Sequence, residues 1–116
     1  MLSRIQFIYD RIEERRNRRY AAPVLLVSID GREFKTANWS MGGFLIENCD
    51  LPCNAGDIVS GTFRATEKLP PVPFAARIIR RDGTSGALAT EFTDLSPEAF
   101  TLLDRAVARR LAGRSL

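Results

Sequence analysis

The sequence has no histidine, only two lysines and two cysteines, and no long hydrophobic run. Without histidine, the chain lacks the usual general base near neutral pH and the Ser-His and Cys-His pairs of many hydrolases. No apolar run approaches the roughly 20 residues that a membrane-spanning helix requires. The N-terminal residues are too polar for the core of a signal peptide. These absences predict a cytoplasmic protein that does not insert into a membrane.

The two cysteines, Cys49 and Cys53, fall in a predicted loop. Zinc sites usually combine Cys with His or with further Cys, so a metal site here would have to be completed by carboxylates. Carboxylates such as Asp57 and Glu91 form no pair and no nucleophile–base arrangement along the sequence. We therefore predict two free thiols in a reducing compartment, no metal site, no catalytic residues and no enzymatic activity.

The basic residues are almost all arginine. The chain has a net charge of +3 and a pI of about 9.3, which is milder than in a dedicated DNA-binding domain. A planar guanidinium can bind phosphate and a guanine edge with paired donors. For the average arginine here, solubility or genome composition is the better explanation, so position along the chain matters more than number.

Hydrophobic periodicity predicts a helix at each end of the chain and six strands between them. Residues 2–16 have an apolar stripe at helical spacing, and Asp30-Gly31 is a strong signal for a type I′ hairpin turn. Ser96 as cap and Pro97 at the first helical position predict the start of the C-terminal helix. Its expected apolar stripe is Phe100, Leu103, Val107 and Leu111. The strands are predicted at residues 23–29, 32–37, 44–48, 58–64, 74–80 and 87–92.

This pattern is typical of a mainly β protein, a small β-barrel with the last helix covering an open end or side. We expect an N-terminal helix or arm at residues 1–14, one barrel domain with its helix at 15–112, and a tail at 113–116. The predicted core includes the strand phenylalanines Phe34, Phe44, Phe63, Phe74 and Phe92.

Two segments contain the residues that we expect to bind a ligand. An arginine cluster, with Arg15, Arg16, Arg18 and Arg19, precedes the first strand. After one predicted hairpin comes Asn38-Trp39-Ser40-Met41-Gly42-Gly43, which its composition predicts to be a turn. Arginine can bind phosphate or stack on a base, Asn and Ser add short hydrogen bonds, and Gly allows a close backbone approach. Together they suit a ligand that carries both phosphates and flat bases.

The order of these pieces resembles the PilZ domain family of bacterial cyclic-di-GMP receptors. That family is marked by RxxxR on an N-terminal loop, here Arg15 to Arg19, and by [D/N]xSxxG on the barrel, here Asn38 to Gly43. Residues 74–81 and 86–92 also resemble the paired late strands of the family. The resemblance covers residues 11–111 and implies a six-stranded antiparallel β-barrel with a C-terminal helix.

The resemblance also implies roles for the site residues. Arg15 and Arg19 would clamp cyclic-di-GMP from the arm, with Arg16 or Arg18 able to share this role. Asn38 and Ser40 would bind a guanine or nearby ligand groups. Gly43 would allow the turn and the close approach, and Gly42 would assist the turn. Trp39 could stack on the ligand or pack against the barrel, and we predict packing because a lone aromatic is usually buried.

The expected function is a receptor without enzymatic activity that needs no cofactor besides its ligand. The charged arm would order when a doubly negative ligand neutralises it, and the N-terminal helix would pass the change to a protein partner or a second copy. A degenerate PilZ-like adaptor that binds no nucleotide is the alternative. An RNA-binding or single-stranded-DNA-binding barrel would need exposed aromatics among its basic residues. The predicted burial of the phenylalanines disfavours that class.

Overall fold

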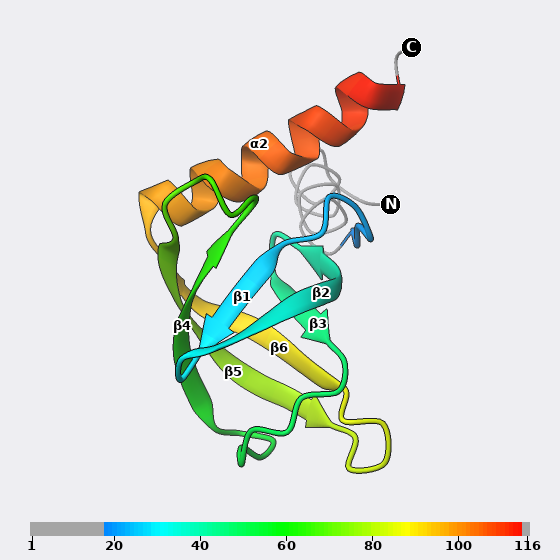
Figure 1. Cartoon of the computed structure of the whole chain (residues 1–116), viewed down its shortest axis with the longest axis vertical. Coiled ribbons are helices and arrows are strands. Elements are labelled where there is room, and N and C mark those ends of the chain that lie inside the picture. The colour runs from blue at the N-terminus through cyan, green and yellow to red at the C-terminus, as the bar shows by residue number, and fades with distance from the viewer. Residues whose placement is uncertain (1–17, 115–116) are drawn as a thin grey trace, which may run out of the picture.

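The computed structural model describes residues 18–114, which form six strands and one long helix (Figure 1). The predicted helix at residues 2–16 lies outside the described residues. The elements are β1 (Leu26–Ile29), β2 (Arg32–Ser40), β3 (Gly43–Ile46), β4 (Ile58–Arg64), β5 (Val72–Arg81), β6 (Leu88–Leu95) and α2 (Pro97–Arg114).

The strands close into an antiparallel barrel in the order β1-β2-β3-β6-β5-β4. The barrel closes through β1 and β4, where Leu26 is opposite Arg64 and Ile29 is opposite Gly61. Closure pairs the outer strands with each other and so removes the free sheet edges that would otherwise attract other chains. The predicted mainly β fold with six antiparallel strands is confirmed.

Most strand boundaries differ from the prediction by a few residues. Residues 23–25 precede β1, β5 is longer at both ends than predicted, and β6 continues to Leu95. Pro73 lies near the start of β5 opposite Thr62, a position where a missing N–H is tolerated. The Asp30-Gly31 turn is confirmed, because both residues have the positive φ values, 52° and 77°, that a type I′ turn requires.

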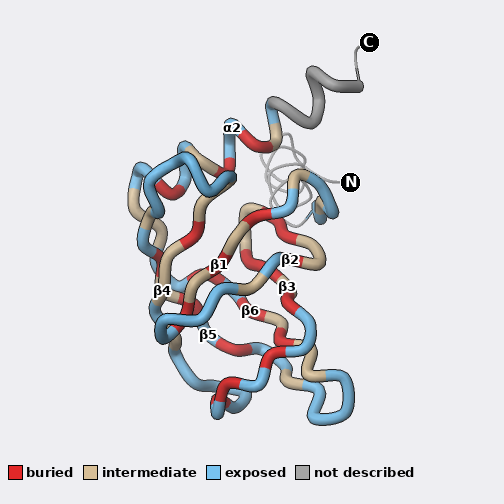
Figure 2. Tube along the Cα trace, in the orientation of Figure 1, coloured by how far each residue is buried: buried red, intermediate tan, exposed pale blue. Residues whose placement is uncertain are grey.

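A cluster of phenylalanines fills the barrel interior. Phe44, Phe63, Phe74 and Phe92 are buried, and their ring centroids lie 5.3–5.8 Å apart in tilted and edge-to-face pairs. Such pairs contribute about 0.5–1.5 kcal/mol each beyond the area they bury. Figure 2 shows buried and more exposed positions alternating along the strands, as expected for a barrel whose interior is filled by side chains. Phe34 is only half-buried, so its predicted place in the core was wrong.

The C-terminal helix lies across one end of the barrel and packs against β5 and β6 (Figure 1). Ser96 caps it as predicted: its Oγ accepts a hydrogen bond from the Ala99 amide at 3.1 Å. The buried face is Ala99, Leu103 and Ala106. Phe100 is 54% exposed, so its predicted place in the apolar stripe was wrong. The helix extends to Arg114, past residue 113, where we expected the tail to begin.

Gly43 is the residue that lets β3 approach β6. A Cβ atom at this position would collide with the carbonyl oxygen of Thr90, which is part of a backbone and cannot swing aside. We predict that Gly43→Ala lowers the free energy of unfolding by about 1–3 kcal/mol, as overpacking does in cores. Urea denaturation measures this loss. Gly83→Ala is the matched control because a Cβ there meets nothing within 4 Å; equal losses in the two variants would contradict the prediction.

Candidate functional site

The motif residues lie at the junction of two strands. Asn38, Trp39 and Ser40 are the last residues of β2, and Gly43 is the first residue of β3. Only residues 41–42 form the turn. The prediction of a turn over residues 38–43 was therefore wrong for most of the segment. The small polar and glycine residues suggested a turn, but Trp39 and Ser40 pair with β3 and continue the strand ladder up to residues 41–42.

A β-bulge in β2 decides which of these side chains face outward. Thr36 is opposite Ile46, and Trp39 is opposite Phe44, so both face the interior with their buried partners. Two inward positions three residues apart break strict alternation, and the register shift between Thr36 and Asn38 supplies the extra residue. The bulge thereby places Asn38 on the outer face, where it is half-buried.

The segment from the arginine cluster to Pro23, called the arm from here on, is attached to the end of β2 by backbone pairing. The Tyr20 amide donates to the Trp39 carbonyl oxygen at 2.7 Å, and the Trp39 amide donates to the Tyr20 carbonyl oxygen at 2.9 Å. We expected the whole arm before the first strand to lack order without ligand. That expectation was wrong from Tyr20 onward, because these hydrogen bonds fix the arm on β2 (Figure 1).

The pairing brings the two motifs into contact. Arg19 immediately precedes Tyr20, and its Nη1 donates a hydrogen bond of 2.9 Å to Oδ1 of Asn38. Both side chains lie at the surface, with Arg19 exposed and Asn38 half-buried. Arg15 and Arg16 lie outside the described residues, so their predicted contacts stay predictions. The described half of the RxxxR motif and the first residue of NxSxxG thus form one polar cluster.

Two hydrogen bonds hold the turn at residues 41–42. Ser40 is buried, and its Oγ accepts a hydrogen bond from the Gly42 amide at 3.0 Å. The Gly42 carbonyl oxygen accepts from the Phe92 amide at 2.7 Å, which ties the turn to β6. Gly43 is required by the close approach to β6 described above. The expected ligand contacts of Ser40, Gly42 and Gly43 stay predictions beside these structural roles.

Trp39 packs rather than presenting its ring at the surface, as predicted. It is fully buried, its Nε1 donates to the Pro23 carbonyl oxygen at 2.7 Å, and its ring centroid lies 5.2 Å from that of Tyr20. Tyr20 and Pro23 were not among the site residues expected from the sequence. The only signal was that an aromatic residue directly follows the arginine cluster, and it did not indicate which strand would receive it.

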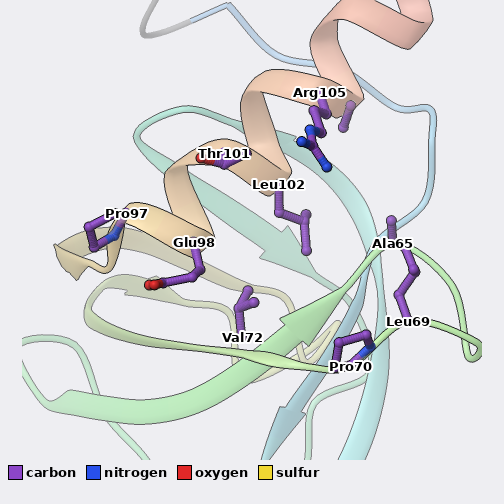
Figure 3. A pocket seen from close by; sticks show the side chains of 10 residues that line it. Ala65, Leu69, Pro70, Val72, Pro97, Glu98, Thr101, Leu102 and Arg105 are labelled. Carbon is purple, nitrogen blue, oxygen red and sulfur yellow. The ribbon is translucent and has the colours of Figure 1, made fainter.

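A groove with a mainly apolar lining lies away from the motif residues. It is an open groove of about 470 Å³ between the first half of α2 and the loop from β4 to β5 (Figure 3). Its charged residues are Glu98 and Arg105, both on α2. The motif residues do not line it, so the groove and the predicted site are separate features. Its apolar lining includes Leu69, Pro70, Val72, Leu102 and Ala106.

The two cysteines are free and buried, in agreement with the prediction of free thiols. Burial raises the pKa of the Cys53 thiol, although Nη1 of Arg81 lies 3.4 Å from its sulfur. The thiol is therefore predominantly protonated near neutral pH and is a poor nucleophile. Within residues 18–114, no group of three or more Cys, Asp or Glu side chains could hold a metal ion. In that same range, no helix is long and apolar enough to cross a membrane.

Comparison with known proteins identifies the family. The PilZ domain model matches residues 11–109, which is most of the chain. Among solved structures, the Bacillus subtilis inhibitor of motility (MotI/DgrA) has a TM-score of 0.64 and 24% identity, and the match covers 81% of this chain. This chain spans about half of that protein, 49% of its length, and the likeness concerns the fold. The search of curated protein sequences finds no significant match.

The barrel topology, the contact between the two motif segments and the match over residues 11–109 agree with one another. The chain belongs to the PilZ domain family.

Proposed function

We propose that this chain is a non-enzymatic receptor that binds cyclic-di-GMP between the arginine arm and the outer face of the β2–β3 hairpin. Family membership supports either a cyclic-di-GMP receptor or a PilZ-like adaptor. The observation that favours the receptor is the hydrogen bond of 2.9 Å from Arg19 to Asn38, which places residues of both motifs at one exposed point. The proposal includes a bacterial origin and a cytoplasmic location.

The contact also defines what each side chain can offer a ligand. A guanidinium only donates, so it holds the amide oxygen of Asn38 toward Arg19. The amide NH₂ of Asn38 is then directed elsewhere and can donate to an acceptor such as the O6 or N7 atom of guanine. The remaining N–H groups of Arg19 can bind a phosphate or a guanine edge. An Asp at position 38 could only accept, so Asn makes this half of the site a donor surface.

Binding would act on the arm through charge. Two ligand phosphates would neutralise the guanidinium groups, including those of Arg15 and Arg16, and draw the arm over the barrel. Because the arm is already fixed from Tyr20 onward, the change would concern the residues before it. The N-terminal segment at residues 2–14 would be repositioned and would carry the signal to a protein partner or to a second copy of the chain.

The second candidate is a protein-interaction adaptor that does not respond to nucleotide. Its support is the structural likeness to a protein named for inhibition of motility, an action exerted on another system. At 24% identity that likeness reflects the fold, and the intact NxSxxG segment and the Arg19–Asn38 contact favour the receptor.

Isothermal titration calorimetry with cyclic-di-GMP separates the two candidates, with GTP and cyclic-di-AMP as controls. Selective binding is the expected result, and its stoichiometry shows whether one ligand or a stacked pair is bound. Absence of both heat and a thermal shift would refute the receptor and leave the adaptor.

Arg19→Ala should weaken cyclic-di-GMP binding by at least about tenfold, because a hydrogen bond to a charged group contributes about 1.5–3 kcal/mol. The thermal midpoint of the free protein should change little, since Arg19 is exposed. Arg80→Ala is the matched control: it removes the same charge from an exposed position on β5, across the barrel from β2. Equal affinities of the two variants would remove Arg19 from the site.

Ser40→Ala should weaken binding and also lower the unfolding free energy by about 1 kcal/mol, because the Gly42 amide loses its acceptor. Calorimetry and urea denaturation measure the two effects separately. Ser60→Ala, at an exposed position on β4, is the control for removing a hydroxyl. If Ser40→Ala loses stability but binds normally, Ser40 serves the turn alone.

Affinity should fall as salt is raised from about 0.1 M to about 1 M, because the Debye length shrinks from about 10 Å to about 3 Å. Arg19→Ala should show a weaker salt dependence than the unaltered chain, since one charge pair has been removed. Calorimetric titrations in a salt series give both slopes. A flat response in the unaltered chain would contradict the arginine clamp.

A further inference from the structure

The only tryptophan of the chain, Trp39, holds the arm by three different contacts. Its backbone exchanges two hydrogen bonds with Tyr20, at 2.7 and 2.9 Å. Its indole Nε1 donates to the Pro23 carbonyl oxygen at 2.7 Å, and its ring packs on that of Tyr20 with centroids 5.2 Å apart. One residue thus binds both ends of the segment from Tyr20 to Pro23.

These contacts determine where Arg19 can reach. Arg19 and Tyr20 are neighbours in the arm, and Asn38 and Trp39 are neighbours in β2. Because the pairing of Tyr20 with Trp39 is antiparallel, Arg19 lies diagonal to Asn38 on the same face of the sheet. A long side chain spans such a diagonal, and the hydrogen bond of 2.9 Å joins the two residues across it. Without that pairing, the exposed contact with Asn38 alone would have to offset the conformational entropy that Arg19 and its backbone lose on ordering.

Because Trp39 is buried, it can position other residues of the site but cannot itself contact a ligand. The residue has no exposed surface, so it cannot stack on a ligand in this structure. Its indole N–H is the one feature that phenylalanine or leucine could not supply at the same place, since both are apolar throughout. A buried ring at this position needs only to be apolar, whereas a bond to the Pro23 carbonyl needs a donor.

We propose that Trp39 is the positioning residue of the site: its indole N–H, together with its pairing to Tyr20, fixes the arm on β2 and so presents Arg19 beside Asn38. The consequence for nucleotide affinity rests on the proposed receptor function. The effect on the arm does not, because it belongs to the protein without ligand.

The test is Trp39→Phe, which keeps an aromatic ring and removes the donor. Amide hydrogen exchange is followed by NMR at Tyr20, whose amide is bonded to the carbonyl oxygen of residue 39. Exchange should become about three- to tenfold faster, as expected for loss of one net hydrogen bond. The Gly56 amide, bonded to the Ile78 carbonyl oxygen at 2.7 Å, is the internal reference and should be unchanged. Equal acceleration at both amides would mean general destabilisation and would overturn the proposal.

Calorimetry then tests positioning against direct contact. Trp39→Phe should weaken cyclic-di-GMP binding about three- to tenfold. In the Arg19→Ala background, the same substitution should lower the affinity only slightly further, because both changes act through the same arginine. Additive losses would indicate that Trp39 acts independently of Arg19 and would overturn the proposal. Faster exchange at Tyr20 with unchanged affinity would do so as well.

A second variant covers the case in which Trp39→Phe does not fold. Tyr20→Ala removes the half-buried ring from the arm and leaves the core intact. Its readout is the Trp39 amide, bonded to the Tyr20 carbonyl oxygen, which should also exchange faster while Gly56 is unchanged; no change at Trp39 would overturn the proposal. If the unaltered chain binds no cyclic-di-GMP, the receptor function fails, and the exchange data alone decide whether Trp39 holds the arm.

Discussion

The end of β2 is hydrogen-bonded along both of its edges, and the arrangement of the site depends on this double pairing. On one edge it pairs with β3, and on the other it pairs with β1 and then, past the bulge, with Tyr20 of the arm. A strand paired on both sides has little freedom to shift its register. Side chains on this short segment are therefore held in fixed directions: Trp39 into the interior and Asn38 onto the surface.

The core and the site are consequently not independent. Trp39 is opposite Phe44, and Phe44 belongs to the phenylalanine cluster that fills the barrel. Gly43 and Gly42 bind the same hairpin to β6, through a close backbone approach and through a hydrogen bond from Phe92. The NxSxxG motif is therefore also part of the junction between β3 and β6. Substitutions in it must be judged by stability and by binding together.

The separation of the groove from the motif residues has a physical basis. The groove forms where a helix lies over one end of a barrel and its apolar side chains meet those of a proline-containing loop. The motif residues have the opposite character, a polar surface with an exposed guanidinium. A ligand with phosphates and flat bases gains more from donors and planar charge than from an enclosed apolar volume. The groove and the proposed nucleotide site therefore suit ligands of different chemistry.

The sequence was sufficient to predict the fold class, the hairpin at Asp30-Gly31, the helix start at Ser96 and the family, because these depend on local conformational preferences and on the order of short motifs. It also indicated that Trp39 would be buried. It could not place the bulge in β2, the pairing of Tyr20 with Trp39 or the bond from the indole to Pro23. Those features arise when the chain folds, because each depends on which strands become neighbours as the barrel closes. Residues distant in the chain carry no local signal for that choice.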